Sequence, residues 1–209
     1  MWGLVTKDYY LLRRQAWWVL VLLFFSYFFG FRGGAAAVLA ISTGISAYLL
    51  VLSSLSIEDK NNSLSFLRLL PVPTRAIVDA KFMQLVLGGL LGEVCGLVIV
   101  AFISVTGLKT VTGPEVIWGL IFSLAVVEIL YSPTLWLFFR FGGRVNRIAS
   151  LITWFVLWFT IVPIMGVPIM GLFATLPVAA GVLLALLTVA CFGFFLVLAR
   201  RAFVRREMR

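Results

Sequence analysis

The amino-acid sequence predicts an all-α polytopic integral membrane protein, and three observations carry that prediction. Of the 209 residues, 63% are hydrophobic and only 12% are charged, and the mean hydropathy of +1.13 lies far above that of soluble domains. The hydrophobic residues fall into runs of about 20, the length at which a helix spans a bilayer. The basic residues gather at the ends of alternate runs. We therefore expect a single transmembrane domain over residues 1–209 with six transmembrane helices.

The hydrophobic runs define the expected helices in order along the chain. Their expected bounds are Ala16–Phe31, Ala35–Leu55, Ala76–Val105, Glu115–Phe139, Ile148–Gly171 and Leu176–Ala199. Residues 1–15 mix apolar and charged side chains, which is typical of a helix lying in the membrane interface. A cleaved signal peptide is the competing interpretation of the first run. Because five further runs follow it, we expect the first run to be retained.

The distribution of lysine and arginine predicts the orientation of the chain in the membrane. With six spans, both termini lie on one side, and only Arg32 and Lys109 of the 17 basic residues then fall on the other. An excess of basic residues marks the cytoplasmic side, so both termini and the segment 56–81 are predicted to be cytoplasmic. This bias accounts for the formal net charge of +9, and we expect no binding to nucleic acid.

The segment 56–81 is the longest polar interruption in the sequence. It opens with a charged cluster: Glu58, Asp59 and Lys60. A short apolar helix follows, for which Ser63 is the expected N-cap and which Pro71 ends, before Thr74 caps the next span. A helix this short is unstable alone, so we expect its apolar face to dock on a partner protein, or alternatively to lie on the bilayer surface. The expected anchors are Phe66, Leu67 and Leu70.

Small residues recur every four positions on the second and third spans. These residues are Ala36, Ala40 and Gly44 on the second span, and Gly88, Gly92 and Gly96 on the third. Such a stripe lets another helix approach closely. The sequence therefore predicts tight helix packing along both spans.

The fifth span carries aromatic residues at four-residue spacing, among them Trp154 and Trp158. Residues four apart lie on one face of a helix. An amphipathic or lipid-like substrate suits a wall of this kind, so both tryptophans are candidates for the substrate pathway. Contact with lipid or simple packing is the alternative.

Two carboxylates, Glu93 and Glu128, are expected near the middle of the third and fourth spans. An ionised carboxylate at a lipid-facing helix centre costs about 2.5 to 3.5 kcal/mol, so both should face protein or water. No basic residue shares their depth, and we expect one or both to be neutral and hydrogen-bonded, to each other or to a hydroxyl. The candidate hydroxyls are Ser123, Tyr131, Ser132 and Thr134. We favour a structural tie between the spans, with a polar lining for substrate or protons as the alternative.

Catalysis by this chain is not indicated. The sequence has no histidine, no GxSxG element and no paired-carboxylate metal motif. It also lacks a GxxxxGK phosphate loop. We therefore predict no catalytic residue, no metal site and no cofactor on this chain, and expect any ATP hydrolysis to occur on another polypeptide.

Two segments and the predicted topology together resemble a known family. The chain carries KDYYLLRRQ before the first span and EDKNNSLSFLRLLPVPTRAIVDAKF between the second and third. With six spans and cytoplasmic ends, it resembles the ABC-2 family of ATP-binding-cassette exporter permeases over nearly its whole length. Among its members, we look first to small bacterial exporters of amphipathic peptides, such as the phenol-soluble modulin exporter.

The resemblance implies a half-transporter permease in the bacterial cytoplasmic membrane that moves an amphipathic or hydrophobic substrate outward. Two copies would form the pathway, as a homodimer within membrane lipid, and two separate ATPase subunits would bind ATP and Mg²⁺. It also implies a coupling helix, here about Ser63 to Leu70, seated in a groove of the ATPase. The residues expected to couple to the ATPase are Glu58, Asp59, Lys60, Ser63, Phe66, Leu67, Leu70 and Pro71.

Two other functions stay open at the level of sequence. One is a proton-coupled secondary transporter in which Glu93 and Glu128 exchange protons as substrate moves. The other is a non-transporting membrane scaffold or immunity protein that binds partners. Copurification with a soluble ATPase favours the ABC permease, whereas transport that depends on a proton gradient without ATP favours the secondary transporter.

Overall fold

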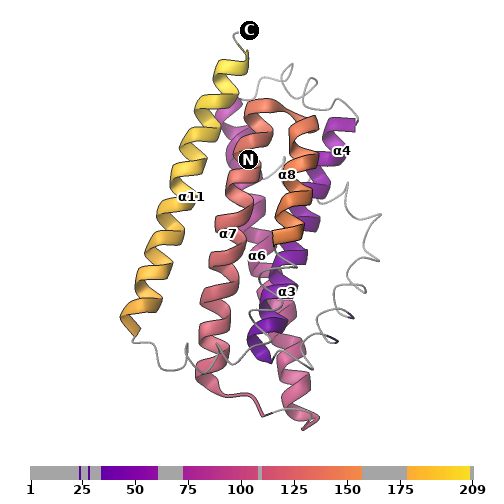
Figure 1. Ribbon diagram of the computed structural model, residues 1–209, viewed down its shortest axis with the longest axis vertical. Coiled ribbons are helices and arrows are strands. Elements are labelled where there is room, and N and C mark those ends of the chain that lie inside the picture. Colours follow the sequence, from indigo (N-terminus) through magenta and orange to yellow (C-terminus); the bar gives the residue numbers. More distant parts are fainter. Residues whose placement is uncertain are drawn as a thin grey trace.

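A computed structural model shows helices packed side by side along one long axis (Figure 1). It describes Phe24, Phe28 and residues 34–60, 73–107, 110–156 and 178–207, and all regular structure in these residues is helical. The helices are α3 (Ala35–Ala47), the π-helix η1 (Tyr48–Ser53), α4 (Ser54–Lys60), α6 (Thr74–Val105), α7 (Gly113–Phe141), α8 (Gly143–Val156) and α11 (Val178–Glu207).

Four helices in the described residues are long and apolar enough to cross a membrane. They are Ala35–Glu58, Thr74–Val105, Gly113–Phe141 and Ala179–Arg205. These helices correspond to the predicted second, third, fourth and sixth spans. Helix α8 covers the first part of the predicted fifth span, and the rest of that span lies outside the described residues. So do the predicted interfacial helix at 1–15 and the predicted first span, apart from Phe24 and Phe28.

Helix α3 is the centre of the bundle, because every one of its residues is buried. It packs against both α6 and α7. The glycine stripe of α6 makes the first of these contacts possible. A Cβ at Gly88 would lie 3.1 Å from the Cα of Ala47, and a Cβ at Gly92 would collide with the backbone of Thr43. The predicted close approach along the third span is thus confirmed.

The alanine and glycine stripe of α3 faces α7 instead. A Cβ at Gly119 would lie 3.1 Å from the Cα of Ala36, and the hydroxyl of Tyr131 donates to the carbonyl of Gly44 at 3.1 Å. A residue in the first turn of α7 also caps the N-terminus of α3. The backbone N–H of Ala35 donates a hydrogen bond to Glu115 Oε1 at 3.1 Å. A carboxylate at this position satisfies a free N–H group and complements the helix dipole.

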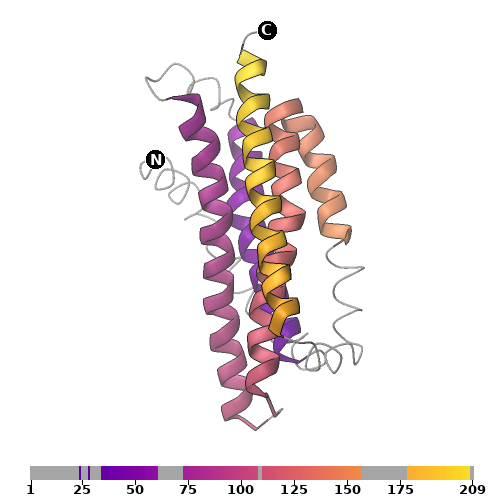
Figure 2. The same cartoon turned by 90° about the vertical axis from the view of Figure 1, so that its left-hand side faces the viewer.

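The two ends of the bundle differ in what they contain. At one end lie the last turn of α4, the first turn of α6, the turn from α7 to α8 and the last turns of α11 (Figures 1 and 2). The turn from α7 to α8 passes through Gly142, whose φ of 86° suits glycine. The starts of α3, α7 and α11 lie at the opposite end.

The predicted polar segment 56–81 is helical at both of its ends. Helix α4 continues to Lys60, and α6 begins at Thr74. Thr74 is the first helical residue rather than the cap, since Pro73 occupies the cap position and no side chain caps the helix. The predicted helix from Ser63 to Leu70 lies outside the described residues.

Large apolar side chains cover the outer faces of α6, α8 and α11. Examples are Leu91, Val98, Ile152, Leu183 and Val189. Exposed apolar surface this extensive is rare on monomeric soluble proteins. It fits helices in contact with lipid, and the chain is a multi-pass membrane protein.

Candidate functional site

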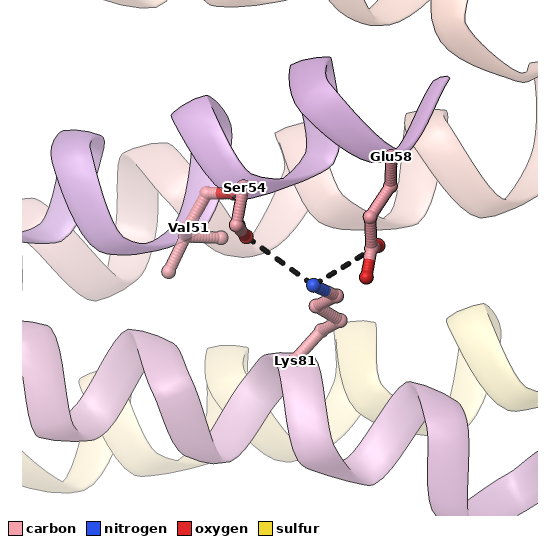
Figure 3. A network of polar contacts seen from close by, with 4 residues as sticks. All are labelled: Val51, Ser54, Glu58 and Lys81. Atoms are coloured by element: carbon pink, nitrogen blue, oxygen red, sulfur yellow. Dashed lines mark hydrogen bonds and ion pairs between the residues drawn. The ribbon is translucent and has the colours of Figure 1, made fainter. Parts of the chain in front are cut away.

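A buried ion pair joins α4 to α6 at the end of the bundle where the segment 61–72 leaves it (Figure 3). Lys81 Nζ lies 3.0 Å from Glu58 Oε2, and the two side chains are only 3% and 0% exposed. Lys81 Nζ also donates to Ser54 Oγ at 3.2 Å. Ser54 Oγ donates in turn to the carbonyl of Val51 at 2.8 Å. The network therefore links α6 to both α4 and the preceding π-helix.

The sequence placed Glu58 with Asp59 and Lys60 in the polar segment between two spans, among the residues expected to couple to the ATPase. The structure instead places Glu58 inside the bundle, facing Lys81. Asp59 and Lys60 belong to the last turn of α4, and their side chains lie outside the described part of the structure. Because the helix runs past the apolar residues, the charged cluster is partly an extension of the second span.

A second ion pair joins α6 to α11 at the same end. Arg200 Nε donates to Asp79 Oδ1 at 2.6 Å, and the side chains are 39% and 19% exposed. Asp79 and Lys81 are two residues apart, so they point about 200° apart around the helix axis. The beginning of α6 is thus held by α4 on one side and by α11 on the other.

A basic hollow of about 390 Å³ lies beside the second ion pair. Its walls are the side chains of Arg75, Val197, Arg200, Arg201, Val204 and Arg205. Long arginine side chains bury their stems against apolar residues while the charged heads stay in the polar layer. This end of the bundle therefore presents positive charge at its surface.

Glu93 lies at the meeting point of α3, α6 and α7. Its Oε1 atom accepts a hydrogen bond from Thr43 Oγ1 at 3.0 Å and another from Ser123 Oγ. The residue is 5% exposed. The predicted bond to Ser123 is confirmed, and it ties the third and fourth spans together as expected. Thr43 was missed, although a hydroxyl beside the small-residue stripe of the second span was a visible signal.

Glu128 has a different environment. It is 8% exposed, and its Oε2 atom has no hydrogen-bond partner among the described residues. It lines a groove of about 350 Å³ between α6, α7 and α11.

The other hydroxyls predicted as partners of the carboxylates are engaged elsewhere or unpaired. Tyr131 donates to Gly44, and Thr134 Oγ1 lies 3.0 Å from Thr153 Oγ1 on α8. Ser132 Oγ has no partner among the described residues. Of the predicted hydroxyl partners, the structure thus brings Ser123 alone to a carboxylate within its described part.

The remaining predicted site residues cannot be placed by their side chains. Trp154 belongs to α8, but its side chain lies outside the described part. Trp158 and the predicted coupling residues Ser63, Phe66, Leu67, Leu70 and Pro71 lie wholly outside it.

Long apolar helices that bury a few paired polar residues, with basic residues at one end, define a multi-pass helical membrane protein. The family model described as ABC-2 family transporter protein matches residues 3–199. The chain belongs to this family, which confirms the resemblance seen in the sequence. It is accordingly the membrane permease of an ABC transporter, a class in which a partner subunit hydrolyses ATP. Neither the comparison with curated proteins nor that with solved structures gave a match.

Proposed function

We propose that this chain is the permease of an ATP-driven exporter in the bacterial cytoplasmic membrane, with the α4–α6 connection facing the cytoplasm. One observation supports this orientation of the chain in the membrane. The basic residues of the described helices fall in the last turn of α4, the first turns of α6 and α8, and the last turns of α7 and α11. These helix ends lie together at one end of the bundle (Figure 1). The residues are Lys60, Arg75, Lys81, Arg140, Arg144, Arg147, Arg200, Arg201, Arg205 and Arg206. Basic residues mark the cytoplasmic side of a membrane protein, which is also where ATP is available.

The coupling element in this proposal is the helix from Ser63 to Leu70, which docks in a groove of a separate ATPase subunit. Phe66, Leu67 and Leu70 act as its apolar anchors. ATP and Mg²⁺ are bound by that partner, since this chain has no phosphate loop.

The buried pair of Glu58 and Lys81 transmits movement of the docked helix to the membrane domain. It connects the two helices that flank the segment 61–72, so a displacement of that segment moves α4 and α6 together. Asp79 and Arg200 extend the connection from α6 to α11. Glu58 therefore acts as a positioning residue, and its side chain does not need to touch the ATPase.

The substrate in this proposal is amphipathic or hydrophobic, including peptides of the kind moved by phenol-soluble modulin exporters, and two copies of the chain form its pathway. Glu128, Trp154 and Trp158 line the pathway, whereas Glu93 ties three helices together. We prefer this function to proton-coupled transport because Glu93 is engaged with Thr43 and Ser123. The family match favours it over a non-transporting scaffold as well.

Copurification tests this proposal. The chain is expected to copurify with a phosphate-loop ATPase encoded beside it, and the double variant Phe66→Ser/Leu67→Ser should lose most of the bound ATPase while inserting normally into the membrane. The matched control is Asn61→Ala/Asn62→Ala, which changes two polar residues before the helix and should retain the ATPase. Equal ATPase recovery with all three proteins would remove this helix from the coupling role.

A further inference from the structure

The two carboxylates in the middle of the bundle differ in what surrounds them. Glu93 lies twelve residues after Lys81 on α6, and Glu128 lies twelve residues before Arg140 on α7, so each is about 18 Å along its helix from the basic end. Glu93 accepts hydrogen bonds from two neighbouring helices. Glu128 faces a groove, with its buried Oε2 atom unpartnered among the described residues.

The groove beside Glu128 is otherwise almost wholly apolar. Its walls include Val86 and Leu90 of α6, Leu124 of α7, and Val189 and Phe192 of α11. Thr188 supplies a second polar atom, since its hydroxyl donates to the carbonyl of Leu184 at 2.8 Å and so keeps a lone pair free to accept. The Thr188 hydroxyl therefore offers an electron pair rather than a donor, and so does Glu128 when its carboxylate is ionised.

No positive charge in the described chain reaches this depth. The stretches 82–105 of α6, 113–139 of α7 and 178–199 of α11 contain no lysine or arginine. Lys81 and Arg200, at the basic end, already contact Glu58 and Asp79. A buried carboxylate is stable in a membrane when it is neutral or when a cation pairs with it.

We propose that this groove binds a lipophilic monovalent cation, with the positive charge beside Glu128 and the hydrocarbon body along α6 and α11. This inference rests on the proposed export function and names a substrate class for it. A volume of about 350 Å³ lies at the lower end of the usual range of about 300–1,000 Å³ for small-molecule sites. The groove therefore suits a compact single cation rather than a lipid with two acyl chains.

Binding of tetraphenylphosphonium to the purified chain in phosphatidylcholine nanodiscs tests the proposal. Radiolabelled ligand is titrated against wild-type protein, with empty nanodiscs subtracted. We expect saturable binding that Glu128→Gln weakens at least about tenfold, because removing one charge of a buried pair is strongly unfavourable. The matched control Glu93→Gln should bind within about twofold of wild type. Tetraphenylborate, an anion of nearly the same shape, should show no saturable binding.

A second variant guards against misfolding as the cause of lost binding. Ala185→Phe fills the groove from an exposed position on α11 and leaves the carboxylate in place. It should also weaken tetraphenylphosphonium binding. Equal affinity of wild type and Glu128→Gln, or equal loss with Glu93→Gln, would overturn the proposal. So would saturable binding of tetraphenylborate.

A second copy of the chain is the alternative occupant of the groove, and cross-linking distinguishes it from the cation. In a background with Cys95→Ala and Cys191→Ala, a cysteine at Leu90 or Val189 is treated with a bifunctional reagent. We expect labelling of monomers that tetraphenylphosphonium slows. Efficient cross-linking into dimers, unaffected by the cation, would overturn the proposal. None of these measurements needs the ATPase, so a failure here leaves the coupling proposal intact.

Discussion

Lys81 carries a positive charge into the bundle, where its ammonium contacts Glu58 and Ser54. Arg200 makes the other ion pair of this end at a partly exposed position. Both pairs join α6 to a neighbouring helix, but their surroundings differ. Removing one charge from a buried pair leaves the other without compensation, whereas water readily solvates the survivor of an exposed pair.

This difference predicts unequal effects of two similar substitutions. Lys81→Met should lower the free energy of unfolding by about 3–5 kcal/mol, and Arg200→Met by no more than about 1 kcal/mol. Adding Glu58→Gln to Lys81→Met should recover part of the loss, since the stranded carboxylate is then removed. Denaturant titration of the purified protein in mixed micelles measures all three. Equal losses for Lys81→Met and Arg200→Met would show that burial does not govern the pair.

At the scale of the helices, the contact between α3 and α6 depends on the absence of side chains. Gly92 touches the backbone of Thr43, and a Cβ there would collide with it. Gly193 on α11 is also helical, but a Cβ there meets nothing within 4 Å. The two glycines are therefore a matched pair for the same substitution.

We expect Gly92→Ala to lower the free energy of unfolding by about 1–3 kcal/mol, the usual cost of forcing extra volume into a packed contact. Gly193→Ala should be neutral or stabilise by up to about 1 kcal/mol, because alanine favours a helix over glycine. Thermal unfolding monitored by circular dichroism compares the two. A loss at Gly193 as large as that at Gly92 would indicate a general intolerance of helix glycines rather than a close contact.

The helices were predictable from the sequence because their lengths are set by the bilayer. Apolar runs placed α6, α7 and α11, and spacing by four revealed the stripe that ends at Gly96. The end of α4 was not predictable, because Glu58 sits in a run of polar residues that reads as a loop. In the structure Glu58 is helical and pairs with Lys81, which lies on another helix, and a contact between helices is not visible in the local sequence.

The candidate site was likewise predictable in part. The depth of Glu93 and Glu128 follows from their place in apolar runs, and Ser123 was named as a partner in advance. Which carboxylate would be paired was not predictable, since that depends on how α3 and α11 lie against α7. Thr43 happens to face Glu93, whereas Thr188, beside Glu128, turns its hydroxyl back to Leu184.

At the scale of the whole molecule, the polar contacts between helices in its described part are concentrated towards the basic end and around α3. Helix α11 is joined to α6 by Arg200 at that end, and along α7 it packs beside the groove that contains Glu128. The basic end is where we place the ATPase, and the groove is where we place the cation. We propose that a displacement of the segment 61–72 shifts α6 and α11, which form two walls of the groove, and so changes the groove.

The most direct test of this account is ATP hydrolysis by the copurified complex in lipid vesicles. The ATPase should hydrolyse ATP faster with the wild-type chain than alone, and a protonophore should leave that rate unchanged. The Phe66→Ser/Leu67→Ser chain should give the rate of the ATPase alone. The same rate with and without the chain would contradict the assignment of this protein as an ATP-driven permease.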